Sequence, residues 1–154
     1  AKLRLVSGEH IRAISDEQLA AALSEFGLPE LPPPALIAAR TGGETLSECA
    51  EVARLLVDPP PPDDAAIEAI AATEVGLAYA VLDELVEKWP PSIEDAERIF
   101  AEFKKELRAD GFDLGVSLRG MRAVFTGRTE GPEFALLMAC IDQSRWVAAG
   151  YYAH

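Results

Sequence analysis

Several features that mark common protein classes are scarce or absent in this sequence of 154 residues. It has two cysteines, Cys49 and Cys140, and two histidines, with no Cys-x-x-Cys spacing, which argues against a disulfide framework and a zinc site. Charged residues interrupt the apolar runs well before the ~20 residues that a membrane span requires. The first ten residues lack the apolar core of a signal peptide. We therefore expect a cytoplasmic protein that binds no metal and no membrane.

Positive charge is also scarce, since 14 Lys and Arg stand against 26 Asp and Glu and the formal net charge is -12. Such a chain repels nucleic acid, because most of the affinity of proteins for phosphate comes from Lys and Arg. One stretch, residues 114–129, contains no acidic residue and three arginines, Arg119, Arg122 and Arg128. Any affinity for nucleic acid therefore has to be local.

Helix signals recur along the whole chain, whereas strand signals do not. Three times an N-cap residue is followed three positions later by an acidic or amide side chain, the spacing of a capping box. Apolar residues then repeat every three or four positions, as on one face of a helix. The sequence thus predicts an all-α fold. The three pairs are Ser15 and Gln18, Thr45 and Glu48, and Ser92 and Asp95.

A proline run over residues 58–64 is the natural boundary within the chain, because proline lacks the N–H group that a helix interior needs. We expect two small helical subdomains, residues 1–60 and residues 61–154. After the boundary, residues 64–89 are predicted to form one long or bent helix. Its common apolar side is expected to carry Ile67, Ile70, Leu77, Val81 and Leu85.

The arginines belong to the segment MRAVFTGRTEGPEF and the helix before it. Arg119 and Arg122 are three residues apart and are therefore expected to share a helix face. Arg128 and Thr129 are expected in a turn between two glycines. This places positive charge where the backbone is exposed.

The end of the segment adds two further features. Pro132 is predicted as the first residue of the next helix, where free amides favour an anion. Phe134 is expected to offer a stacking face. Arginine, an aromatic ring and free amides suit the binding of unpaired RNA bases. The residues alone favour a second interpretation, in which the arginines form surface ion pairs and the glycines only turn the chain.

Three stretches resemble bacterial glutamyl-tRNA synthetases, in the order that this family has them. LRGMRAVFTGRTEGPEF resembles the C-terminal motif of the family, which carries Arg followed by Thr-Gly-Arg-Thr-x-Gly-Pro. KLRLVSGEHIRAISDEQLAAAL is similar to the segment after the family's lysine-serine loop. ARTGGETLSE is similar to the family's Arg-x-x-Thr-Leu-x-Glu. The resemblance covers essentially the whole chain.

These synthetases join glutamate to its tRNA with ATP and magnesium on a catalytic domain whose two signature motifs this chain lacks. The resemblance therefore implies a non-catalytic fragment, the end of the stem-contact region followed by two helical anticodon-binding subdomains. No catalytic residue and no cofactor are expected in this chain. ATP and magnesium are expected to bind only to a parent catalytic domain. The expected partners are the tRNA for glutamate and the parent's own catalytic domain.

The resemblance also implies roles for single residues. Arg122 is expected to bind an anticodon base or phosphate, Arg40 to distinguish anticodons, and Arg12 to touch the tRNA stem or to pair with Glu9 or Glu17. Two extra residues between Arg40 and Thr45 set this chain apart from the family. A pocket for a flipped base is expected from Gly131, Pro132, Phe134 and Ala135. The full set of expected RNA-binding residues is Arg12, Arg40, Arg119, Arg122, Arg128, Thr129, Gly131, Pro132, Phe134 and Ala135.

A different class of function remains open at this point. The same helical scaffold can serve as a free-standing protein-interaction module that binds through its apolar faces. Catalysis by a carboxylate pair is disfavoured, because no such pair has neighbouring catalytic groups.

Overall fold

A computed structural model describes the backbone of residues 2–72 and 74–153 and the side chains of residues 8–72 and 74–150. Over these residues the chain forms helices and no strand, which confirms the predicted all-α fold. The helices are α1 (Lys2–Ala13), α2 (Asp16–Ser24), α3 (Pro33–Gly42), α4 (Leu46–Val57), α5 (Asp64–Ala72), α6 (Val75–Leu85), α7 (Ile93–Ala109), α8 (Leu114–Thr126), α9 (Phe134–Met138) and α10 (Gln143–Ala153).

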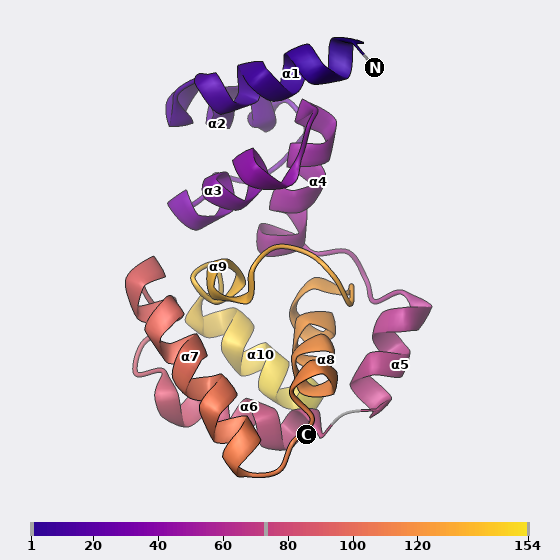
Figure 1. Ribbon diagram of the computed structural model, residues 1–154, viewed down its shortest axis with the longest axis vertical. Coiled ribbons are helices and arrows are strands. Elements are labelled where there is room, and N and C mark those ends of the chain that lie inside the picture. The colour runs from indigo at the N-terminus through magenta and orange to yellow at the C-terminus, as the bar shows by residue number, and fades with distance from the viewer. Residues whose placement is uncertain (1, 73, 154) are drawn as a thin grey trace.

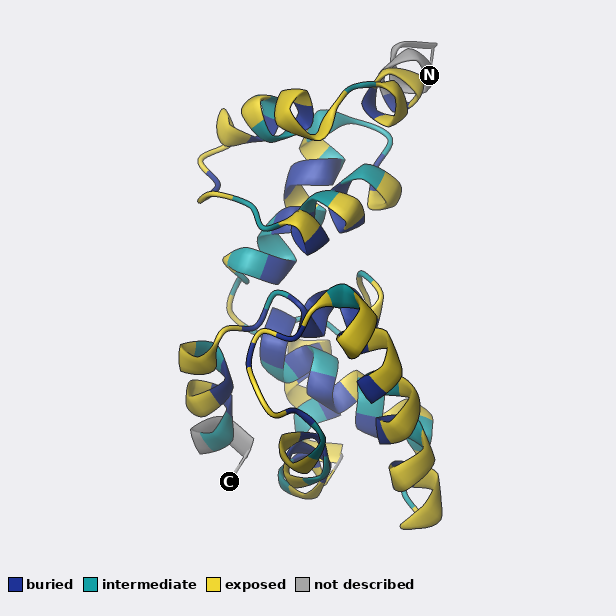
Figure 2. Cartoon of the chain, turned by 90° about the vertical axis from the view of Figure 1, so that its left-hand side faces the viewer, coloured by how far each residue is buried: buried dark blue, intermediate teal, exposed yellow. Residues whose placement is uncertain are grey.

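The helices lie in two groups, which are stacked along the long axis of the molecule (Figure 1). The N-terminal group contains α1 to α4 and the C-terminal group α5 to α10. The proline run lies in the segment that joins α4 to α5. Figure 2 shows that buried residues face inward within each group. Ala35, Ala38 and Leu56 of α3 and α4 belong to the core of the C-terminal group, so the two groups are packed together.

Local sequence signals explain where the helices begin. All three predicted N-cap residues accept a hydrogen bond from the amide three positions on. Ser15 forms the full reciprocal box, because Gln18 Oε1 also accepts from the Ser15 amide at 3.0 Å. Before α4, the Glu48 carboxylate accepts from the amide of Glu44 at 2.7 Å. These bonds satisfy amides that have no partner inside the helix.

The two cores differ in composition. The N-terminal core is built mainly from leucine and alanine, with Leu19 and Leu23 of α2 against Ala39 and Ala53. The C-terminal core is rich in aromatic rings. The Trp146 ring stacks on Tyr79 with ring centroids 4.0 Å apart and on Trp89 at 4.3 Å. Both tryptophans are buried.

One long or bent helix was expected over residues 64–89, and the structure has two helices with a sharp bend between them. α5 and α6 meet at 79°, and α6 ends at Leu85. Ile67 and Leu77 are 54% and 55% exposed, so the predicted common apolar side does not exist. Each helix has its own buried face, because the bend breaks the 3.6-residue period between them. In the described part of the chain no single helix is long and apolar enough to cross a membrane; α5 and α6 reach that length and composition only together, across the bend.

Arg145 of α10 connects the two groups. It donates hydrogen bonds to the carbonyl of Leu56 in α4, to that of Phe125 in α8 at 3.1 Å and to that of Cys140 at 3.3 Å. Carbonyls at helix C-termini have no partner inside the helix and carry partial negative charge, which a guanidinium satisfies. Burial lowers the pKa of Arg145, while Cys140 and Asp142 oppose that shift.

Candidate nucleic-acid interface

The segment between α8 and α9 carries four of the ten residues expected to bind RNA, Arg128, Thr129, Gly131 and Pro132. Asp113 caps α8 by accepting from the Val116 amide at 2.9 Å. The helix ends at Thr126, where Gly127 adopts the left-handed conformation with φ of 73°. This conformation favours glycine and ends a helix in the usual way. The predicted helix and its stop at Gly127 are therefore confirmed.

The first part of this segment, Thr126 to Arg128, packs against the proline run. A side chain at Gly127 would collide with the carbonyl of Pro60. Arg128 Nη1 donates to the carbonyl of Pro61 at 3.0 Å, and its Nε lies 3.5 Å from the carboxylate of Asp63. Arg128 thus holds the connection between the two helix groups, and it is not the free cation that the sequence suggested.

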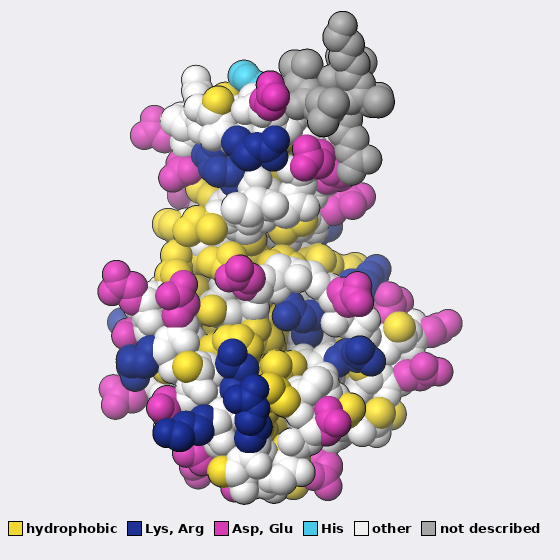
Figure 3. All heavy atoms as spheres, in the orientation of Figure 1, with side chains coloured by type: hydrophobic (Ala, Val, Ile, Leu, Met, Phe, Trp, Pro, Cys, Tyr) yellow, Lys and Arg dark blue, Asp and Glu magenta, His cyan; other side chains and the backbone are white. Residues whose placement is uncertain are grey.

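The second part of the segment faces a cleft between the helix groups. Gly131, Pro132 and Glu133 form one wall, and the α3 end with Thr41 and Gly42 forms part of the other. The cleft has a volume of about 390 Å³, within the range of small-molecule sites. A hydrophobic band crosses the surface at this waist of the molecule (Figure 3). The segment therefore has one end that is part of the scaffold and another that borders an open cleft.

Arg122 lies behind the cleft wall, in the middle of α8. Its Nη1 donates to the carbonyl of Pro132, and a side chain at Gly131 would lie 4.0 Å from the same atom. The guanidinium sits 5.8 Å from the centroid of the Phe134 ring, a cation–π distance. Burial lowers the pKa of Arg122, while Glu130 opposes this, and the group keeps its charge at neutral pH. The guanidinium of Arg122 has five N–H donors, and the Pro132 carbonyl accepts from one of them. The other donors remain for a ligand.

Phe134 and Ala135 do not have the expected role in this structure. They are 2% and 6% exposed and belong to the C-terminal core. The Phe134 ring therefore offers no free face to a base. Helix α9 also begins at Phe134 and not at Pro132, and it has only five residues. A local sequence pattern could not reveal this, because the buried side of so short a helix depends on what packs on it.

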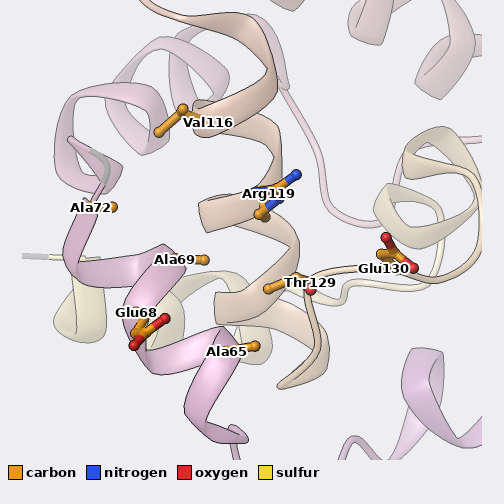
Figure 4. A pocket seen from close by; sticks show the side chains of 8 residues that line it. All are labelled: Ala65, Glu68, Ala69, Ala72, Val116, Arg119, Thr129 and Glu130. Carbon is orange, nitrogen blue, oxygen red and sulfur yellow. The ribbon is translucent and has the colours of Figure 1, made fainter.

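Arg119 and Thr129 line a second groove, between α5 and α8, with a volume of about 470 Å³. Figure 4 shows Ala65 and Ala69 of α5 pointing toward α8 across this groove. Arg119 is exposed, and the groove also contains the acidic Glu68. Arg119 and Arg122 are three residues apart in α8, as predicted, but their surroundings differ, because Arg119 borders this groove whereas Arg122 bonds to the carbonyl of Pro132.

Arg40 is held inside the N-terminal group. Its Nη1 donates to the carbonyls of Ile11 at 2.6 Å and Ile14 at 2.8 Å, and its Nη2 pairs with Asp16 at 2.9 Å. The carbonyls lie at the C-terminus of α1, where a cation is favourable. The guanidinium that was expected to read the anticodon is thus turned away from the cleft. Arg12 forms an exposed ion pair with Glu44, at 3.8 Å, in place of the acidic partners expected for it.

Sequence reasoning missed two residues on α7. The Lys104 ammonium lies 4.5 Å from the centroid of the Phe100 ring, and this ring stacks on Phe134 with centroids 5.1 Å apart. Phe100 is partly exposed and packs against the C-terminal core. Phe100 and Lys104 are four residues apart in the sequence. This spacing could have indicated the contact, because residues four apart are neighbours on a helix. Over α7 and α8, Lys and Arg side chains border a hydrophobic strip (Figure 3).

Metal ligands do not converge in the described residues, where no three His, Cys, Asp or Glu side chains are grouped to hold an ion. Burial raises the pKa of Cys140 to about 12, although Arg145 opposes the shift, so this thiol stays protonated at neutral pH. Reactive cysteines have lowered pKa values. The residues that remain available for binding are those of the cleft, Arg122 and the cations of α7 and α8.

Comparison with known proteins supplies the decisive observation. A family model described as an anticodon-binding domain matches residues 9–148, and thus both helix groups. The chain belongs to this family. Its all-α fold agrees with that membership, and tRNA is the partner that an anticodon-binding domain binds. A search of curated proteins found no match to this chain.

Proposed function

We propose that this anticodon-binding domain recognises the anticodon of the tRNA for glutamate, as the non-catalytic part of a glutamate–tRNA ligase. The observation that carries the proposal is the cleft beside Arg122, which is walled by Gly131 and Pro132 in a chain of the anticodon-binding family. The choice of glutamate rests on the three stretches that resemble glutamyl-tRNA synthetases. A cytoplasmic location stays a prediction.

The cleft suits a base that has been unstacked from the anticodon loop. Pro132 supplies an apolar surface. Arg122 lies directly behind it, bonded to the Pro132 carbonyl, and we propose that its other donors bind a base edge or a neighbouring phosphate. Glu133 is exposed at the cleft and can accept from the exocyclic amino group of a cytosine. Arg40 has no part in this proposal, because its guanidinium already has three acceptors inside the N-terminal group.

The charge of the chain limits the affinity of the domain. With a net charge of -12, few phosphate contacts are available. Binding is therefore expected to be weak, with a shallow salt dependence, because the slope of log affinity against log salt grows with the number of phosphates neutralised. ATP, magnesium and the catalytic residues are assigned to a separate catalytic domain, which would make further contacts with the tRNA.

The test measures fluorescence anisotropy of labelled tRNA transcripts with the full chain at low salt. We expect the tRNA for glutamate to bind at least tenfold more tightly than the same tRNA with a replaced anticodon. Arg122→Gln should weaken binding by about 10- to 100-fold, because a bidentate contact of arginine with a base discriminates by ~1–3 kcal/mol. Arg54→Gln, which alters an arginine at the end of α4, is the matched control and should bind as wild type. Equal binding of both tRNAs would contradict the proposal.

A further inference from the structure

A row of cations and aromatic rings, partly at the surface and partly buried, runs from α7 to α8 in the C-terminal group. Lys104 lies over Phe100 at 4.5 Å, Phe100 stacks on Phe134 at 5.1 Å with an angle of 18° between the rings, and Arg122 lies 5.8 Å from Phe134. The row begins on α7 and ends at the guanidinium behind the cleft. It therefore connects the proposed anticodon site with a helix that the family motif does not include.

The two phenylalanines differ in what they can bind. Phe134 is 2% exposed and has a structural role, whereas Phe100 is partly exposed. The Phe100 ring is also fixed from below, because it stacks on Phe134 and lies on a helix. An immobilised and partly exposed ring is a preformed platform for an unpaired base, since little freedom is lost when the base stacks.

Lys104 has no acidic neighbour one helical turn away, although Glu97 stands one turn before Phe100 and the chain as a whole is acidic. The residues three or four positions from Lys104 are Phe100, Ala101, Leu107 and Arg108. Among the described residues neither Lys104 nor Arg108 forms an ion pair. Surface lysines on an acidic helix usually have a carboxylate within reach. These cations remain free for phosphate.

We propose that Phe100 is a second base-stacking position of the RNA interface, with Lys104 as its phosphate contact. An unpaired nucleobase of the anticodon loop stacks on the exposed part of the Phe100 ring. The ammonium of Lys104 moves off the ring to the phosphate of the same nucleotide. Lysine suits this exchange, because it is a flexible point charge without a fixed geometry. The inference rests on the proposed binding of tRNA, but it concerns α7 and not the cleft.

The test uses the full chain and an anticodon stem-loop RNA in which 2-aminopurine replaces one loop base at a time. Wild-type protein should quench the fluorescence at one loop position, and Phe100→Leu should abolish this quenching. Leucine keeps an apolar side chain on Phe134, and a thermal melt checks that the variant folds. Affinity should fall about tenfold, as for the loss of one base–aromatic stack.

Lys104→Gln provides the second arm of the test and does not alter an aromatic ring. It should weaken binding two- to threefold and lower the slope of log affinity against log salt by about 0.7, the value for one phosphate of a single strand. Phe26→Leu changes a ring that is 38% exposed at the end of α2 and is the matched control, with no expected effect.

The outcomes separate this inference from the proposed function. If the wild-type chain binds the stem-loop and Arg122→Gln weakens it, but Phe100→Leu and Lys104→Gln bind and quench as wild type, the role of α7 is refuted and the proposed function stands. If the wild-type chain does not bind the stem-loop at all, both are refuted. Loss of quenching in Phe100→Leu, with Phe26→Leu unchanged, supports the inference.

Discussion

The two ends of the segment between α8 and α9 are only a few residues apart, yet they have different tasks. Thr126 to Arg128 bonds to its own turn and to the proline run, through the Thr126 hydroxyl, the Gly127 backbone and the Arg128 guanidinium. Gly131 and Pro132 instead line an open cleft. A motif that reads as one RNA-binding unit in the sequence is thus part scaffold and part surface. Arginine is charged both in the scaffold and at the surface, so the charge of a residue does not show to which of the two parts it belongs.

The largest effect is expected for Gly127→Ala at the scaffold end. Alanine at φ of 73° costs ~1–2 kcal/mol, and its Cβ would also meet Pro60 and lie 3.1 Å from the carbonyl oxygen of Pro61. We expect a loss of ~2–4 kcal/mol in the free energy of unfolding, measured by urea denaturation. Gly111→Ala is the control, because φ is 82° there and nothing lies near the Cβ. Equal losses in the two variants would show that contact with the proline run adds nothing.

A smaller loss is expected for Thr126→Val, which removes only a hydroxyl. This buried group donates to the Arg122 carbonyl at 2.8 Å and accepts from the Arg128 amide at 3.2 Å. Leaving these partners unsatisfied should cost ~1–2 kcal/mol of unfolding free energy. Affinity for tRNA at a temperature where the variant is folded should stay within twofold of wild type. A large loss of affinity without a change in stability would place Thr126 in the RNA interface.

Arg128→Gln tests whether an arginine of the motif belongs to the scaffold. The variant loses the bond to Pro61 and the partly exposed pair with Asp63, worth about 1 kcal/mol together. We expect a modest fall in the urea midpoint and an unchanged salt dependence of tRNA binding. A salt slope that falls by about one unit, with stability intact, would instead identify Arg128 as a phosphate contact.

The smallest effect on stability is expected at the cleft end, for Pro132→Ala. The variant keeps the carbonyl that Arg122 binds and removes only the ring. Greater freedom of the unfolded chain should cost about 0.5 kcal/mol. Affinity for tRNA should nevertheless fall several-fold in anisotropy titrations, because the cleft loses an apolar wall. If stability falls while affinity for tRNA does not, the cleft end is also part of the scaffold. The proposed difference between the two ends of the segment would then be refuted.

The sequence predicted best what depends on neighbouring residues. The N-caps Ser15, Thr45 and Ser92 and the helix stop at Gly127 were found by local rules, since their partners lie within four residues. The bend between α5 and α6 was not placed, because both sides of it carry apolar residues at helical spacing. The exposure of Ile67 and Leu77 then depends on which helices pack beside them.

The candidate site was found only in part, for the same reason. The sequence correctly singled out the segment that borders the cleft, and its resemblance to a tRNA-binding family agrees with the family match. It misjudged Arg40, whose partner Ile11 is 29 residues away, and Arg128, whose partner Pro61 is 67 residues away. It also predicted a free stacking face for Phe134, whereas this ring is buried.

By itself, the sequence determined the all-helical fold, the capped starts of three helices and the segment that carries the arginines, because hydrophobic periodicity and capping act between residues a few positions apart. Only the tertiary structure decided which arginines are free to bind a ligand. A guanidinium is charged in every setting, and its role depends on whether distant carbonyls and carboxylates already accept its donors. The chain brings these acceptors together only when it folds.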